Sequence, residues 1–135
     1  MTVKDTIAMI ASMSPELTNG TWVYCCEPDR ETASALATQA IAVVQEVEGT
    51  TLILPGDTAA SHGYDTRLTM RQITLNVFSD LEGTGLTAAV AQALTDVGIS
   101  CNVVAAYHHD HVFVPQADAE RAMAALVAAQ KKAAG

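Results

Sequence analysis

The sequence has few charges, few aromatic side chains and few cysteines. Only 16% of its 135 residues are charged, and acidic residues outnumber basic ones by 15 to 7, giving a formal net charge of −8. Such a surface repels polyanions, so nucleic acids and anionic membranes are poor partners. No segment approaches the roughly 20 apolar residues of a membrane helix. Residues 1–13 also lack an apolar stretch of signal-peptide length, and we therefore expect a cytoplasmic protein.

The three cysteines, Cys25, Cys26 and Cys101, are an odd number, which without a secretion signal indicates reduced thiols. Neighbouring strand residues point to opposite faces, so Cys25 and Cys26 cannot share one metal ion. We expect all three to pack as small buried apolar residues. The sequence also lacks a Gly-x-Ser-x-Gly elbow, a Cys-x-x-Cys pair and a phosphate-binding loop. It therefore predicts neither an enzyme nor a cofactor.

Half of the residues are hydrophobic, and their spacing is clearest in the C-terminal half. Alternating apolar residues predict strands, and apolar residues three and four apart predict amphipathic helices. The predicted elements are a strand over 72–79, a helix over 86–97, strands over 99–106 and 111–114, and a helix over 119–127. Gly98 stands where a C-cap glycine is expected. This β-α-β-β-α order is one strand short of a complete split βαβ sandwich.

The N-terminal half repeats this plan less clearly. Its predicted elements are a helix over 3–11, a strand over 21–26, a helix capped by Asp29 and running through Val44, a strand over 50–54, and a short helix or linker over 57–68. We place the boundary so that residues 1–66 and 67–135 form two halves. Neither half has enough strands alone, so we expect their sheets to complete each other within one chain or between two.

An acidic loop with two glycines joins the predicted strand 72–79 to the helix that follows. Its glycines let the backbone approach a ligand, and the unpaired N–H groups of a helix start attract a carboxylate. Its acids can accept hydrogen bonds from an ammonium group, so the loop suits an α-amino acid. Alternatively, Ser79 or Thr84 caps the helix and the acids favour its positive end. The candidate ligand-binding residues here are Asp80, Leu81, Glu82, Gly83, Thr84, Gly85 and Leu86.

A second cluster, His108 to His111, holds three of the four histidines. His109 and His111 fall on one side of an extended strand, a spacing that suits Zn²⁺, with Asp110 or His62 as further ligands. This cluster favours a metal-binding protein or metal-dependent enzyme as an alternative function. The other interpretation is that the imidazoles only hydrogen-bond across a polar hairpin turn.

Asn102 is a polar amide within an otherwise apolar predicted strand. Such an amide requires a hydrogen-bond partner, which is a ligand, adjacent backbone or a water molecule. Trp22 and Tyr24 share one face of the predicted strand 21–26 and either line a pocket or pack in a core or interface.

Several segments together carry a resemblance to a known family. They are Gln72 to Leu75, Asp80 to Val90, Gly98 to Tyr107, His108 to Pro115 and, in the N-terminal half, Glu48 to Pro55. Through them the chain resembles a bacterial family of small proteins formerly grouped as a domain of unknown function and now described as ACT-domain-like. The resemblance spans about residues 20–126. It implies an α+β fold, a ferredoxin-like βαββαβ sandwich of two ACT-like halves with antiparallel sheets.

ACT domains bind amino acids or other small effectors, using the loop between the first strand and first helix. Carried over to this sequence, the site is Asp80 to Leu86, with Asn102 and Val103 as a second wall. The family's usual Asp-x-x-Gly loop here has the additional acid Glu82, which favours a cationic ligand. The chain is also similar to the tandem ACT modules of eukaryotic cytosolic arginine sensors. The resemblance thus implies a homodimeric sensor of an amino-acid-like effector, and a protein–protein interaction module without a small ligand is a further alternative.

Overall fold

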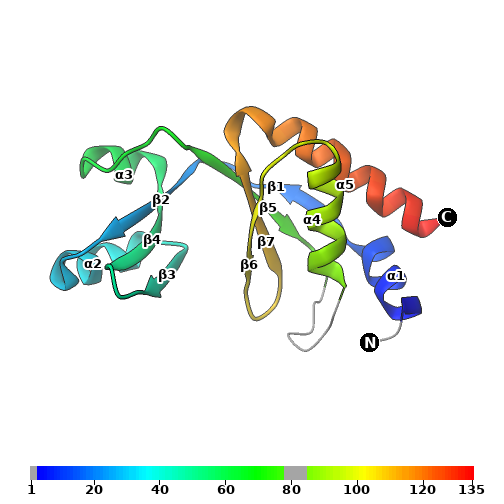
Figure 1. Ribbon diagram of the computed structural model, residues 1–135, viewed down its shortest axis with the longest axis horizontal. Coiled ribbons are helices and arrows are strands. Elements are labelled where there is room, and N and C mark those ends of the chain that lie inside the picture. Colours follow the sequence, from blue (N-terminus) through cyan, green and yellow to red (C-terminus); the bar gives the residue numbers. More distant parts are fainter. Residues whose placement is uncertain (1–2, 78–84) are drawn as a thin grey trace. The chain divides into compact units, whose positions relative to one another are not determined.

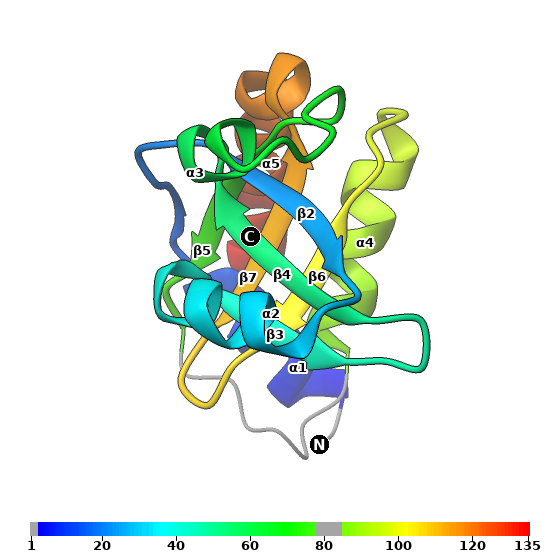
Figure 2. The same cartoon turned by 90° about the vertical axis from the view of Figure 1, so that its left-hand side faces the viewer.

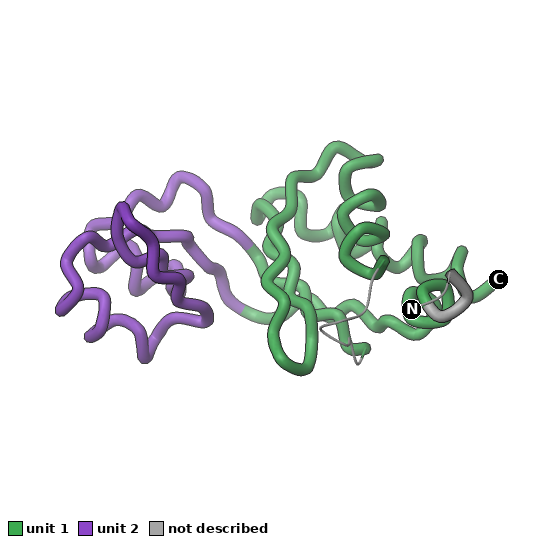
Figure 3. The backbone as a smooth tube through the Cα atoms, turned by 60° about the horizontal axis from the view of Figure 1, so that its bottom comes forward, with its two compact units in different colours: residues 1–19, 71–135 green, residues 20–70 purple. Residues whose placement is uncertain are grey.

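Two units divide the chain, and one is inserted into the sequence of the other. The computed structural model describes residues 3–77 and 85–135. The inserted unit comprises residues 20–70, and the outer unit comprises residues 1–19 together with residues 71–135 (Figure 3). The division predicted from the sequence, 1–66 and 67–135, differs from these units in residues 67–70 and, above all, in residues 1–19. They belong to the outer unit because the strand they contain pairs with a strand of the C-terminal half.

The outer unit is a sheet covered by helices (Figure 1). Its helices are α1 (Val3–Ser12), α4 (Leu86–Asp96) and α5 (Ala119–Ala134), and its strands are β1 (Pro15–Leu17), β5 (Met70–Leu75), β6 (Asn102–Ala105) and β7 (Asp110–Pro115), with a 3₁₀ turn η2 (Gln116–Asp118) before α5. The strand order is β1-β5-β7-β6. Both β1 with β5 and β6 with β7 pair antiparallel. Strand β1 therefore supplies the strand that the C-terminal half lacks.

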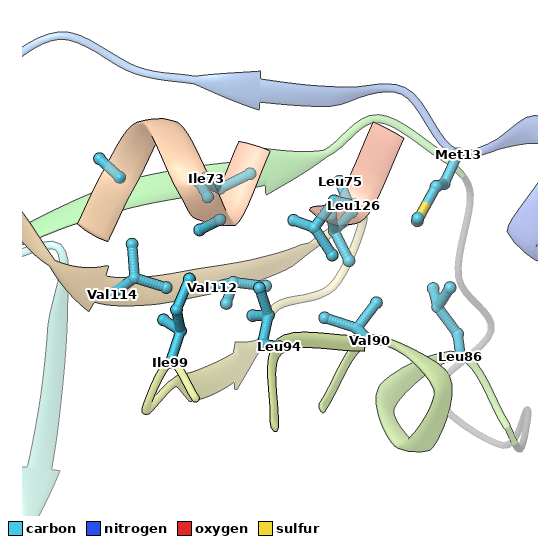
Figure 4. Close-up of a cluster of buried hydrophobic side chains, with 12 residues drawn as sticks. Met13, Ile73, Leu75, Leu86, Val90, Leu94, Ile99, Val112, Val114 and Leu126 are labelled. Carbon is cyan, nitrogen blue, oxygen red and sulfur yellow. The ribbon is translucent and has the colours of Figure 1, made fainter. Parts of the chain in front are cut away.

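The core of the outer unit lies between this sheet and its helices (Figure 4). Val90 and Leu94, one helical turn apart on α4, meet Leu126 of α5 and alternate residues of the strands. Helix α5 also packs along α1 and contacts α4. Each large side chain buried in this way contributes roughly 1.5–3 kcal/mol relative to an exposed position.

The inserted unit is smaller and has short helices (Figure 2). Its elements are β2 (Trp22–Glu27), α2 (Arg30–Leu36), a 3₁₀ turn η1 (Ala37–Gln39), β3 (Ala42–Gln45), β4 (Thr50–Pro55) and α3 (Gly56–Ser61). The strand order is β3-β4-β2, and both pairs are antiparallel. Its core consists of Val23, Cys25, Ala33, Leu36, Leu52, Leu54 and Ala59.

A repeat with an offset of sixty residues relates the two units. Strands β3 and β4 correspond to β6 and β7 at this offset, and both hairpins keep the same register. Strands β4 and β7 have the same pattern of buried and partly buried residues over six positions. Both end in a proline, and a helical segment begins directly after it. Ala59 and Ala119, again sixty residues apart, are both buried. The weak repeat predicted from the sequence is thus a structural one.

The helix predicted to run from Asp29 through Val44 is wrong in its second half. Helix α2 ends at Leu36, and residues 42–45 form strand β3. Ala40, Ile41 and Val44 are spaced compatibly with a helix, but the β-branched residues of this segment favour a strand, and here pairing with β4 satisfies its backbone. The predicted strand 72–79 is also displaced, because β5 begins at Met70 and ends at Leu75.

Other local predictions are confirmed or corrected by the structure. Asp29 caps α2 by accepting a hydrogen bond from the backbone N–H of Thr32, as expected. Gly98, with a φ of +74°, adopts the left-handed conformation expected just after α4. Cys25 is buried, whereas Cys26 is exposed, contrary to the expectation of burial. In the described part of the chain, no helix is long and apolar enough to cross a membrane.

Candidate functional site

The loop predicted to bind a ligand is described only at its end. Residues 78–84, and with them Asp80, Leu81, Glu82, Gly83 and Thr84, lie outside the described residues. Gly85 occupies the N-cap position of α4, with a φ of +98° and no side chain to cap the helix. Leu86 begins α4 and is buried in the outer core. Leu86, which was predicted to bind the ligand, therefore packs in the core.

Gly85 lies against the first helix of the chain. A Cβ atom at this position would lie 2.5 Å from Cγ2 and 3.0 Å from Oγ1 of Thr6 in α1. Both this contact and the positive φ require glycine. The backbone at the start of α4 therefore lies directly against the Thr6 side chain of α1.

Asn102 and Val103, predicted as one wall of the site, point to opposite faces of β6. Asn102 is exposed and pairs with Phe113 of β7, whereas Val103 pairs with Val112 and packs against the outer core. Successive side chains of a strand alternate between its faces. Only one of the two can line any single pocket, and Asn102 is the one accessible from solvent.

The equivalent strand-to-helix connection of the inserted unit, between β2 and α2, is fully described. Glu27 accepts hydrogen bonds from the Tyr64 hydroxyl at 2.5 Å and from the backbone N–H of Asp29 at 2.9 Å. Burial, together with this bond to the Glu27 carboxylate, raises the pKa of Tyr64 to about 12. The hydroxyl and backbone N–H of Thr32 both donate to Asp29 and hold the pKa of that carboxyl below its usual range. Glu27 and Asp29 thus stabilise the local structure of this connection, which is the role that the capping alternative gives to the acids of the loop before α4.

A hollow of about 220 Å³ lies beside α2, against β3 and the start of β4. Its lining residues are Arg30, Ala33, Ser34, Ala37, Val43, Gln45 and Thr50. The Arg30 guanidinium donates from Nη1 to the Gln45 side-chain oxygen at 2.5 Å, and the Thr50 hydroxyl donates to the same oxygen at 3.4 Å. Drug-sized ligands occupy pockets of roughly 300–1,000 Å³, so this hollow suits a smaller molecule.

The polar lining of the hollow is rich in donors. The remaining N–H groups of Arg30, the amide N–H₂ of Gln45 and the hydroxyl of Ser34 can all donate, and no carboxylate lines the hollow. A planar guanidinium fork with neighbouring donors matches a carboxylate in both shape and charge. The arrangement can therefore hold a small carboxylate through Arg30, while Ala33, Ala37 and Val43 contact its apolar part.

The residues of this hollow were not identified from the sequence. The predicted helix through Val44 placed Val43 on a helix and left Gln45 outside any site. Alignment of the sequence with itself at an offset of sixty matches Ala42–Gln45 with Asn102–Ala105, a predicted strand. This match predicts a strand over residues 42–45 in place of the helix. A strand there places Gln45 within reach of Arg30.

The histidine cluster is divided between two faces of its hairpin. His111 is half-buried, and its Nδ1 lies 3.0 Å from Nε2 of Gln72 and 3.1 Å from the hydroxyl of Thr74. Burial lowers the pKa of His111, with His109 adding to the shift. Asp110 is buried, and because it is the neighbour of His111 in β7, its side chain lies on the opposite face of the strand.

His109 directs Nδ1 toward the carbonyl oxygen of Val77, at 3.3 Å. The residues that the structure describes contain no group of three or more histidine, cysteine, aspartate or glutamate side chains able to hold a metal ion. The neighbours of His109 and His111 fit the hydrogen-bonding interpretation of the cluster, and the metal-binding alternative stays a prediction.

Comparison with protein families decides what these two units are. A model of the ACT domain matches residues 2–71, and a second model of the ACT domain matches residues 68–128. The chain belongs to the ACT domain family. The resemblance seen in the sequence is confirmed, as is the fold of two α+β ACT halves. ACT domains are regulatory ligand-binding modules. No curated protein matches this ACT chain.

Solved structures share the fold of this chain. A protein of unknown function from Vibrio cholerae, described as a possible transport protein, is 38% identical, with a TM-score of 0.84 over 95% of this chain and 98% of its own. A protein from Agrobacterium tumefaciens is 17% identical, with a TM-score of 0.69 over 87% and 89% of the two chains. The ligand-free regulatory subunit of aspartate kinase from Thermus thermophilus is 14% identical, with a TM-score of 0.64 over 87% and 96%. The last two likenesses concern the fold alone.

Proposed function

We propose that this ACT protein is a cytoplasmic sensor that binds an amino-acid-like effector and regulates another protein, without catalysing a reaction itself. The observation that carries the proposal is the donor-lined hollow around Arg30 within a tandem ACT fold. The fold is one of regulatory ligand-binding modules, and the hollow has the size and the charge for a small carboxylate. Three free cysteines agree with a reducing compartment.

Within this proposal, the effector's carboxylate binds Arg30, with Ser34 and Gln45 as further donors. The loop Asp80 to Leu86, with Asn102 beside it, is retained as the second proposed effector site, where the two acids would bind an ammonium group. The hollow binds through the positive charge of Arg30, whereas the loop binds through the negative charges of Asp80 and Glu82. Substitutions that remove each charge therefore distinguish them.

Thermal-shift measurements with each of the twenty amino acids test the proposal. A ligand at a hundredfold excess over its Kd stabilises the folded state by about 2.7 kcal/mol, which is a readily measured rise in Tm. We expect Arg30→Gln to reduce the affinity by roughly tenfold to a hundredfold, since a hydrogen bond to a charged group contributes about 1.5–3 kcal/mol. Arg67→Gln is the matched control, because Arg67 is an exposed arginine of the same unit that pairs only with Asp65 among its described contacts.

The double variant Asp80→Ala/Glu82→Ala tests the loop separately. If it loses the response while Arg30→Gln keeps it, the effector binds at the loop and not in the hollow. An absence of any shift with all twenty amino acids would refute amino-acid sensing, as would a full response in both variants.

An interaction module is the second candidate function, because one sheet edge is apolar. Val43 and Val44 on the edge strand β3 are 41% and 54% exposed. Such an edge can pair with an extended segment of another protein. Val44→Lys abolishes that pairing without altering the hollow's polar groups, so it separates the two functions. We also propose that the protein is a homodimer.

A further inference from the structure

Helix α5 presents one face to the core and a different face to solvent. Ala119, Ala122 and Leu126 are buried in the outer core, and α1 and α4 pack against the flanks of the helix. A groove of about 460 Å³ runs along α5 beside this buried face, and Met123 at its edge is partly buried against the outer core. Its lining residues are Glu120, Met123, Ala124, Val127, Ala128 and Lys131. These positions recur at intervals of three and four, so they form one continuous stripe.

The stripe is apolar in its centre and oppositely charged at its ends. Larger side chains, Met123 and Val127, alternate with the small Ala124 and Ala128. Glu120 stands at one end and Lys131 at the other, eleven residues or about 16 Å apart along the axis. Both charged residues are exposed, and neither has a salt bridge among the described residues. The stripe is therefore complementary, in charge and in side-chain size, to a second copy of itself that runs in the opposite direction.

We infer that a second copy of this chain covers the stripe, with the two α5 helices antiparallel about a twofold axis. In this arrangement Glu120 faces the partner's Lys131, and Lys131 faces the partner's Glu120. Met123 then faces the partner's Ala128, and Ala124 faces the partner's Val127, so a large side chain meets a small one in every layer. The inference rests on the proposed homodimer and names its interface.

Two other pairings satisfy the charges less well. A parallel pair of α5 helices would place Glu120 against the partner's Glu120. Antiparallel self-pairing of β3 would bring Glu46 and Glu48 of each copy toward the other chain, and residues 40–49 contain no basic residue to meet them. For a protein with a net charge of −8, an interface that pairs each acid with a base avoids repulsion between the copies.

The interface consists of a single helix pair, which buries less than the roughly 1,600 Å² of a standard stable complex. The dimer is therefore weak, and its dissociation constant lies in the micromolar range or above. It forms and dissociates within the range of concentrations accessible to sedimentation equilibrium. A weak dimer also makes the charge pairs measurable, since no large apolar contact masks them.

Charge reversal tests the interface on the full chain by sedimentation equilibrium. Lys131→Glu and Glu120→Lys should each raise the dissociation constant roughly tenfold, because two attractive pairs become two repulsive ones. The double variant Glu120→Lys/Lys131→Glu should restore the parent value. Lys132→Glu is the matched control, because Lys132 is an exposed neighbouring cation that does not line the groove, and it should dimerise like the parent.

Three results would overturn the inference: a parent that stays monomeric at every concentration, single variants that dimerise like the parent, or a double variant that is not restored. A dimer that survives charge reversal but is lost in Val44→Lys assigns the interface to β3 instead. Amino-acid binding measured on the same samples keeps the two proposals distinct. Binding by a permanently monomeric protein refutes the interface alone, whereas a dimer without binding refutes the sensing function alone.

Discussion

The inserted and outer units share a plan but differ in how much they bury. The outer unit buries twelve described hydrophobic residues in one core, among them six leucines and isoleucines, and it encloses them with helices of 10 to 16 residues. The inserted unit buries seven, two of which are alanines, under helices of six and seven residues. The short α2 leaves Val43, on its side of the sheet, exposed and the hollow beside it open. One copy of the repeat thus has the larger core, and the other carries the accessible hollow.

Loss of a core leucine should affect the two units unequally. Leu126→Ala and Leu54→Ala each remove a fully buried side chain and should each cost about 3 kcal/mol. Because Leu54 represents a larger share of its smaller core, we expect Leu54→Ala to unfold the inserted unit locally. Urea denaturation followed by residue-resolved hydrogen exchange should then show β2, β3 and β4 unprotected while α4 and α5 remain protected. Uniform loss of protection in Leu54→Ala would mean that the units unfold as one.

The contact between Gly85 and α1 offers a comparison of two glycines with positive φ, one in each unit. Gly85→Ala should cost about 2–3 kcal/mol, because its Cβ meets Thr6 as well as requiring left-handed backbone. Gly63→Ala, at a φ of +78° with no atom within 4 Å, should cost about 1 kcal/mol. Thermal denaturation measures both. Thr6→Ser removes the clashing methyl group and should recover part of the lost stability only in Gly85→Ala. Equal losses of stability at both glycines would show that α1 can shift to accommodate the added methyl group.

The smallest expected effect concerns His111 and is specific to the outer unit. Burial lowers the pKa of His111 below its usual 6.5, so the unfolded chain binds a proton more readily than the folded one. The free energy of unfolding should therefore fall as the pH drops below about 6.5 and should level off below the folded pKa. Urea unfolding between about pH 7.5 and about pH 5.5 should show this fall in the parent and in His108→Gln, an exposed neighbour, and a weaker one in His111→Gln. An unchanged slope in His111→Gln would assign the pH dependence to other groups.

Periodicity in the sequence predicted the outer unit better than the inserted one, for a physical reason. The long helices α4 and α5 carry several turns of apolar spacing, and the hairpin β6–β7 is rich in β-branched residues, so each pattern has a single interpretation. The segment from Ala40 to Val44 is short and apolar, and short apolar runs fit a helix or a strand equally well. The pairing of β1 with β5 was not predictable from local pattern, because three residues joined across more than fifty positions leave no periodic signal.

The candidate site shows the same limit. Asp29 was correctly predicted as a cap because capping is a local interaction between residues three positions apart. Arg30 and Gln45 were missed because they meet only after β3 has paired with β4. The predicted function of Asp80 to Leu86 depends on residues outside the described part of the chain and stays a prediction. Family resemblance supplied the ACT assignment, which composition and spacing could not.

The insertion of one unit within the other also determines how this protein is made. Strand β1 ends at Leu17, but its partner β5 begins only at Met70, so some fifty residues must be translated in between. At roughly 5–20 residues per second, β1 waits for several seconds after leaving the ribosome. The strands β2, β3 and β4 pair with one another within residues 22–55, so this part of the inserted unit can form by then. The unit with the smaller core is therefore synthesised first, and the larger core can close only after α5 has been synthesised.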